Sequence, residues 1–180
     1  MSLKFEAGMH VRYGGNGICL IDRIEDVPSP DFQPPRRCYI LKPLRNNGMV
    51  VSVPVDSEVL CAKLKPLLSR EEIDRMLSET AQQEPMEWQP DRKLRGSEFR
   101  RILSAGDADQ LLRLIRCVLH QRSLLAQNGK HLSAMDENFR KDAERMLDDE
   151  FAFSLGITPI EAGKYICRML DVPPRDVPQQ

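Results

Sequence analysis

The one tryptophan of this chain lies in a short segment that is bounded by prolines and followed by cations. The segment reads Pro85-Met-Glu-Trp88-Gln-Pro90-Asp-Arg92-Lys93. An indole held at a surface beside arginine and lysine can stack on a base or wedge into a distorted base step, while the cations hold phosphates. The plainer interpretation is that Trp88 packs between two parts of the protein, as a lone tryptophan beside a helix start more often does.

Charge is divided unevenly along the second half of the chain. Residues 88–131 hold nine basic and four acidic residues, a net charge of +5, whereas residues 132–155 hold three basic and seven acidic residues, a net charge of −4. A basic segment that includes Arg95 is expected if one face of the protein meets phosphates. Ordinary solvated helix faces are the alternative, and composition alone does not separate the two.

Residue types with catalytic or metal-binding chemistry are scattered. His10, His120 and His131 form no metal-ligand spacing, and Gly14–Gly17 lacks the Lys-Ser/Thr that follows the glycines of a phosphate loop. The five cysteines are widely spaced and form no CxxC, which favours reduced, buried thiols over disulfides or a zinc site. We therefore predict no cofactor, no metal and no enzymatic activity; an enzyme with an unrecognised site is the least supported interpretation.

Length and composition set the outer limits. The chain has 180 residues, of which 41% are hydrophobic, and a formal net charge of −1. This is enough for one large or two small domains, and attraction to nucleic acid must come from a local patch. No apolar run approaches the roughly 18–20 residues of a membrane helix, and the start lacks a signal-peptide core. We expect a cytoplasmic protein.

Residues 1–66 have the pattern of a small β domain. Partial alternation of β-branched and aromatic residues predicts strands at Met9–Tyr13, Ile18–Ile24, Cys38–Leu41 and Met49–Val55. Asn47-Gly48 predicts a two-residue hairpin turn, and the prolines of residues 27–35 predict a loop that cannot carry a sheet ladder. Strands of this number and length fit a barrel of SH3 or Tudor size.

Residues 67–172 have a helical pattern. Ser69, Asp107, Ser133 and Thr158 are predicted N-caps, and a further helix should begin near Asp91. The apolar residues after Asp107 wrap more than one side, so we place that helix centrally. The helix that begins near Asp91 carries four apolar residues, Leu94, Phe99, Ile102 and Leu103. Residues 173–180 form a predicted flexible tail. The fold class is α+β, a small β-barrel followed by an all-α domain.

The order of these features resembles the CarD family of bacterial transcription factors that bind RNA polymerase. The similarity spans about residues 3–165, and no single motif in it is specific. It rests on Phe5-Glu-Ala-Gly-Met-His-Val-Arg-Tyr13, Asn16-Gly-Ile18, Ile21-Asp-Arg-Ile-Glu25, Tyr39-Ile-Leu-Lys42, Val53-Pro-Val-Asp56, Ser69-Arg-Glu-Glu72, Trp88 with Arg92-Lys93, Leu132-Ser133, Ala143-Glu-Arg-Met-Leu147 and Glu150-Phe-Ala-Phe-Ser-Leu-Gly156.

The resemblance implies a Tudor-like barrel that docks on the polymerase β subunit and a helical domain that contacts promoter DNA at the upstream edge of the bubble. The implied polymerase-binding residues are Val51, Ser52, Val53 and Pro54, and the DNA-binding residues are Trp88, Arg92, Lys93 and Arg95. Three places depart from the family pattern. In the first turn, Tyr13-Gly14 and Asn16 stand where many members have Tyr-Pro and a histidine. Ser52 stands where a basic residue is common, and Pro90 stands where an arginine is common.

The expected mechanism follows from tethering. A barrel edge can add to a partner's sheet, and the anchored helical domain then meets DNA at high effective concentration. We expect a monomer, located on the nucleoid through RNA polymerase, that stabilises the open complex largely independently of sequence. Activation and repression remain equal alternatives. The rival hypothesis is a non-catalytic module that bridges two proteins without contacting DNA.

Overall fold

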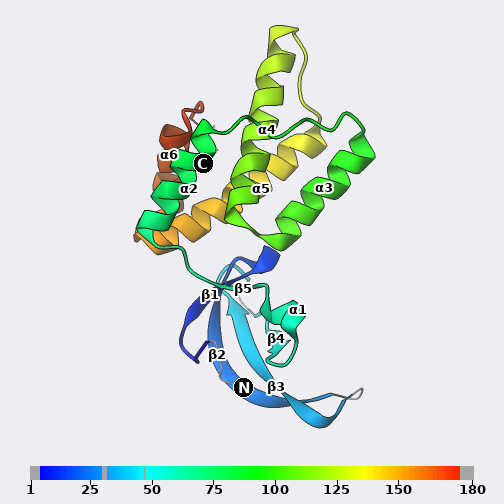
Figure 1. The fold of residues 1–180 in the computed structure, drawn as a ribbon, viewed down its shortest axis with the longest axis vertical. Helices are drawn as coiled ribbons and strands as arrows, with labels where there is room; N and C mark the ends of the chain where they lie inside the picture. The colour runs from blue at the N-terminus through cyan, green and yellow to red at the C-terminus, as the bar shows by residue number, and fades with distance from the viewer. Residues whose placement is uncertain (1–4, 30–31, 47, 175–180) are drawn as a thin grey trace. The chain divides into compact units, whose positions relative to one another are not determined.

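The structure, a computed structural model, describes residues 5–29, 32–46 and 48–174. The chain divides into two units, Met1–Leu67 and Leu68–Gln180, each with its own hydrophobic core. The first unit is a sheet and the second is helical, so the α+β class is confirmed (Figure 1). No helix in the described part of the chain is both long and apolar enough to span a membrane.

The first unit is a five-stranded antiparallel sheet with strand order β4-β3-β2-β1-β5. Its strands are β1 (His10–Tyr13), β2 (Ile18–Ser29), β3 (Phe32–Pro43), β4 (Val51–Pro54) and β5 (Leu64–Pro66). Within the described residues no pairing joins β4 to β5, so the sheet has two free edges and the predicted closure into a barrel is not found. A 3-10 turn (Gly14–Asn16) joins β1 to β2, and the short helix α1 (Glu58–Cys61) lies between β4 and β5.

The hairpin of β2 and β3 is longer than predicted, and the expected proline loop is wrong. The ladder continues past Val27, which pairs with Arg36, to Ser29, which pairs with Phe32. Pro34 and Pro35 fall in the register shift between these two pairs, where no ladder hydrogen bond requires a backbone N–H. The predicted two-residue turn is not found either, because residues 44–50 connect β3 to β4; Asn47 itself lies outside the described residues.

The described part of the second unit, residues 68–174, contains five helices, and their caps explain where they begin. They are α2 (Arg70–Gln82), α3 (Arg92–Ala105), α4 (Ala108–Gln127), α5 (Ala134–Leu155) and α6 (Pro159–Leu170). The predicted caps are confirmed, since the side chains of Ser69, Asp107, Ser133 and Thr158 each accept a backbone N–H of the first helical turn. Residues 175–180, part of the predicted tail, lie outside the described residues.

Helix α4 is central, as its apolar pattern predicted. It packs against α2, α3 and α5, and residues on several of its sides are buried: Leu111, Leu112, Leu114, Ile115 and Val118. The apolar residues of α3 lie on different faces of the helix. Leu94 is 59% exposed, whereas Phe99 and Ile102 are buried. Phe99 and Ile102 lie three residues apart on one face of the helix, and Leu94 lies on the opposite face with exposed Ser97 and Glu98.

Candidate functional site

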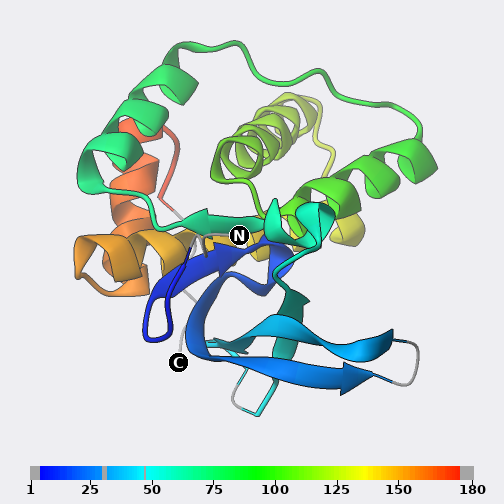
Figure 2. The ribbon, with the colours of Figure 1, turned by 60° about the horizontal axis from the view of Figure 1, so that its bottom comes forward.

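The segment that carries Trp88 connects α2 to α3, two helices on opposite sides of α4 (Figure 2). Arg116 of α4 fastens the beginning of this segment. Its Nη1 donates to the backbone carbonyls of Thr80 and Gln83, the latter at 2.6 Å. Arg116 belongs to the basic stretch identified in the sequence, but here it satisfies the open carbonyls at the C-terminus of α2.

Trp88 is partly buried against the helical core. Its ring meets Phe99 edge to face, with centroids 6.3 Å apart and an interplanar angle of 68°. Phe99 in turn meets Phe139 of α5 at 5.6 Å. The indole is therefore anchored by an aromatic cluster and is neither free in solvent nor sealed inside.

Arg95 is packed over the indole. Its Cζ lies 4.3 Å from the centroid of the Trp88 ring, and the residue is only 6% exposed. Nε and Nη2 donate to the two carboxylate oxygens of Asp136 at 2.9 and 3.0 Å. Nη1 donates to the carbonyl of Gln89 at 2.7 Å and to that of Pro90 at 3.3 Å. Arg95 thus lies within the predicted site, but its guanidinium is engaged inside the protein.

Asp136 is the partner that sequence reasoning missed. It is 2% exposed and occupies the first turn of α5, where Ser133 Oγ donates to its Oδ2 at 2.6 Å. Burial works against its charge, but the hydrogen bonds from Arg95 and Ser133 outweigh burial and lower the pKa of Asp136 below its ordinary value. The spacing Ser133-x-x-Asp136 indicates a helix start, yet nothing in the sequence shows which arginine it meets.

Arg92 and Lys93 are exposed in the first turn of α3. Neither side chain makes a hydrogen bond or ion pair with another described residue, in contrast to that of Arg95, although the charge of Arg92 contributes to lowering the pKa of Asp136. Asp91 caps the helix, its Oδ1 accepting the N–H groups of Lys93 and Leu94 at 2.8 and 2.9 Å. Cations at a helix N-terminus oppose the macrodipole, so this turn concentrates positive charge at a local cost in stability.

The other cations of the basic segment divide into engaged and open ones. Arg101 is held by Glu98 through bonds of 2.7 and 3.0 Å, and Arg122 approaches Glu137 at 3.9 Å. Arg100 is exposed on the same face of α3 as Lys93, with Ser97 between them. That face, which we call the α3 basic face, consists of Lys93, Ser97 and Arg100.

The predicted partner-binding residues form strand β4, a free edge of the sheet. Val53 is fully buried and its side chain belongs to the sheet core, whereas Ser52 is exposed. The N–H of Val55 donates to the backbone carbonyl of Arg37 at 2.9 Å, so these two residues form a hydrogen-bonded pair. Two and four residues earlier, Val53 lies opposite Tyr39 and Val51 lies opposite Leu41. Because bonded and non-bonded pairs alternate in an antiparallel ladder, Ser52 directs its N–H and C=O away from β3.

Exposed apolar side chains lie near this edge. Met49 and Val50 immediately precede β4, and Val59 of α1, a helix that contacts β4, is 75% exposed. The helix α1 was not predicted, although Ser57 caps it by accepting the N–H of Leu60. The free backbone groups of β4 and these apolar residues together form a surface that another extended chain could cover.

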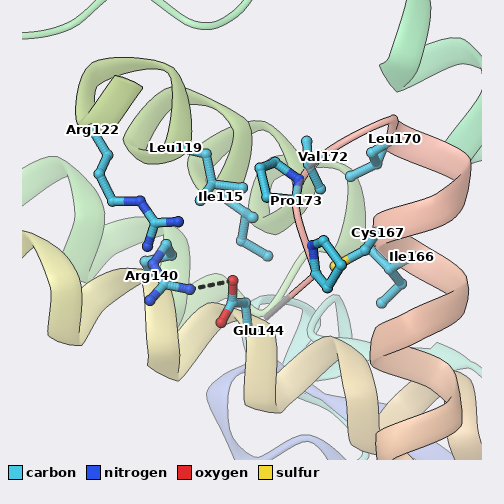
Figure 3. A pocket seen from close by; sticks show the side chains of 11 residues that line it. Ile115, Leu119, Arg122, Arg140, Glu144, Ile166, Cys167, Leu170, Val172 and Pro173 are labelled. Carbon is cyan, nitrogen blue, oxygen red and sulfur yellow. Dashed lines mark hydrogen bonds and ion pairs between the residues drawn. The ribbon is translucent and has the colours of Figure 1, made fainter. Parts of the chain in front are cut away.

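A groove elsewhere on the helical unit lies between α4, α5 and α6 (Figure 3). Its charged lining residues are Arg122, Arg140 and Glu144. Arg140 is engaged inside the protein, since its Nη1 donates to Glu144 at 2.5 Å and its Nη2 to Glu137 at 2.8 Å. The remaining lining is mainly apolar, with Ile115, Leu119, Ile166 and Leu170 among it. Within the described residues, no three His, Cys, Asp or Glu side chains are grouped so as to hold a metal ion.

Comparison of the chain with models of known protein families gives no match, and comparison with curated proteins gives none. The geometry of the Trp88 segment and of the β4 edge therefore has to carry the functional argument.

Proposed function

We propose that this protein is a transcription regulator of the CarD type, which docks on the β subunit of RNA polymerase and stabilises the promoter open complex. The observation that carries the proposal is the state of Trp88. The indole is held by Phe99 and Arg95 but stays partly exposed. It is followed within five residues by two exposed cations whose side chains make no hydrogen bond or ion pair with a described residue.

The helical unit supplies the DNA contact in this proposal. Trp88 stacks at the upstream edge of the melted region, and Arg92 and Lys93 hold the phosphate backbone. Their place in the first turn of α3 supports this role, because residues that break a local stability rule tend to mark functional sites. Arg100 extends the positive charge along the α3 basic face.

The first unit supplies the polymerase contact. Strand β4 has an outward N–H and C=O at Ser52, and strand addition would pair these with an edge of the β subunit. Met49, Val50 and Val59 would cover apolar surface of the partner. We regard this sheet as a Tudor-like module that is open between β4 and β5.

Tethering explains how a chain of net charge −1 can act on DNA. Once the first unit is bound to polymerase, the helical unit meets the promoter at high effective concentration, so a small patch is sufficient. Only a contact that is stronger in the melted state shifts the equilibrium toward it. One stacked aromatic ring contributes about 1–3 kcal/mol, which is roughly a five- to hundredfold shift. Because stacking does not read the identity of the base, the regulator acts at promoters of differing sequence. Its place of action in this proposal is the cytoplasm, where RNA polymerase is.

The test is the lifetime of open complexes formed by RNA polymerase holoenzyme on a promoter. We expect Trp88→Leu to shorten the lifetime gained on adding the protein, because leucine fills the space beside Phe99 but cannot stack. Phe139→Leu is the matched control, since it also removes an aromatic neighbour of Phe99. Equal lifetimes for wild type and Trp88→Leu, with polymerase binding intact, would remove the wedge role.

The second candidate is a protein that bridges two partners without touching DNA. It is favoured by the packing of Trp88 on the helical core and by exposed apolar residues such as Ile160 in the helical unit. This alternative predicts that association with polymerase is retained when Arg92 and Lys93 are both changed to alanine, and that open-complex lifetime is unchanged by that double substitution.

A further inference from the structure

Arg95 occupies one face of the Trp88 ring with a group that is itself immobilised. The guanidinium lies 4.3 Å from the ring centroid and makes four hydrogen bonds, two to Asp136 and two to backbone carbonyls. Four of the five N–H donors of this guanidinium are engaged. It therefore cannot turn outward to bind a phosphate without leaving the carboxylate of Asp136 buried and unpaired.

The same arginine holds the main chain on which the indole is mounted. Its Nη1 donates to the carbonyls of Gln89 and Pro90, the two residues that follow Trp88. The segment from the end of α2 to the start of α3 has no regular secondary structure, so these bonds fix a backbone that no helix or ladder holds. Arg95 thus contacts both the indole and the backbone that follows it.

Asp136 connects this clamp to the helical core. It lies in the first turn of α5, where its backbone N–H donates to Ser133 Oγ and its carboxylate accepts from Ser133 and Arg95. The planar fork of arginine matches both carboxylate oxygens, which sets the orientation of the guanidinium as well as its position. The position of the indole is therefore fixed relative to α5 through its contact with Arg95 and the bonds of Arg95 to Asp136.

We infer that Arg95 and Asp136 are positioning residues that hold Trp88 ready and leave one face of its ring for a single base. The inference rests on the proposed function and deepens it. Because Arg95 covers one face of the ring, at most the opposite face is left for a base, so Trp88 caps one base and does not intercalate between two. A ring that is ordered before binding loses less conformational freedom on stacking, so more of the contact appears as stabilisation.

The test uses the full chain with Asp136→Asn and Arg95→Lys. Trp88 is the only tryptophan, so time-resolved fluorescence anisotropy reports its motion alone. We expect both substitutions to increase the fast, local part of the anisotropy decay and to shorten open-complex lifetime about threefold or more, a part of the full stacking effect. Glu98→Gln is the matched control, because it breaks an exposed pair with Arg101 on the same helix and should change neither quantity.

The outcomes separate the clamp from the function it serves. Unchanged local motion of Trp88 in both variants, with far-ultraviolet circular dichroism like that of wild type, overturns the clamp. Increased motion with an unchanged lifetime, when Trp88→Leu does shorten the lifetime, overturns the positioning role and leaves the proposed function standing. If Trp88→Leu itself has no effect, the proposed function fails. A base stacked on both sides of the indole in a complex with promoter DNA would contradict the single-face contact.

Discussion

At the scale of single residues, the role of a cation here depends on one partner. Lys93 and Arg95 lie two positions apart in the same helix, and a charge count treats them alike. Lys93 is exposed, whereas Arg95 meets Asp136, which lies 41 residues further along the chain. Charge patterning therefore indicates a candidate basic segment, but which of its cations are engaged inside the protein depends on the fold.

The buried pair leads to a prediction about stability and pH. Asp136→Asn should lower the free energy of unfolding at pH 7 by about 3 kcal/mol, because the charge of Arg95 stays buried without its partner. The pKa of Asp136 is lowered in the folded state, so the stabilisation is present above the unfolded pKa of about 3.9 and is lost as pH falls through the lower folded value. Urea unfolding at pH 7 and at steps down to pH 3 measures this.

The comparison for that prediction is Asp142→Asn. Asp142 pairs with Arg145 at the surface of α5, so its loss should cost less than about 1 kcal/mol at pH 7. Two results would contradict the strength that the geometry of the buried pair indicates. One is equal destabilisation by the two substitutions; the other is a difference in free energy of unfolding between wild type and Asp136→Asn that does not shrink below about pH 4.

At the scale of elements, the α3 basic face should set the salt dependence of DNA binding. Lys93→Ala should reduce the slope of log K against log salt by about 0.9, as expected for one lost phosphate contact with duplex DNA. A salt titration of the full chain on a promoter-length duplex measures the slope. Arg101→Ala is the control, since Glu98 already holds that guanidinium, and an equal change in both variants would show that α3 carries only diffuse charge.

Strand β4 allows a test of strand addition that leaves the sheet intact. Ser52→Pro removes the one β4 N–H that we infer to point outward, while Val51 and Val53 keep their bonds to β3. We expect binding to RNA polymerase to fall by tenfold or more, about 1.4 kcal/mol, as measured by surface plasmon resonance.

Ser52→Val separates backbone from side chain, because valine keeps the N–H and suits a strand. Near-wild-type binding of Ser52→Val together with weak binding of Ser52→Pro supports pairing through the backbone of β4. If the proline variant bound normally, the docking surface would lie elsewhere on the first unit.

The helices were predictable because their signals are local. Ser69, Asp107, Ser133 and Thr158 act within four residues, and each begins a helix as expected. The failures come from longer-range pairing. The β2–β3 ladder places its prolines in a register shift, and the free edges of β4 and β5 depend on strand order, neither of which is visible in local spacing. The anchoring of Trp88 by Phe99 and Arg95 is also tertiary and could not be predicted from local spacing.

At the scale of the whole molecule, the two units have separate cores and separate candidate surfaces. This separation predicts that the tasks can be divided. Residues 1–67 alone should compete with the full chain for RNA polymerase but should not prolong the open complex, because they lack Trp88. A competition pulldown followed by a lifetime measurement tests both parts of this prediction, with circular dichroism to show that the fragment is folded. If the folded fragment did not compete, the docking surface would lie on the helical unit.

The central claim is that this protein binds the melted promoter more tightly than the closed one through a single indole. The most direct measurement compares the affinity of the protein for polymerase bound to a pre-melted promoter and to the same promoter held as duplex. The account predicts a preference of about five- to hundredfold for the pre-melted template, falling toward unity in Trp88→Leu but not in Phe139→Leu. Equal affinity of the wild-type protein for both templates would contradict it.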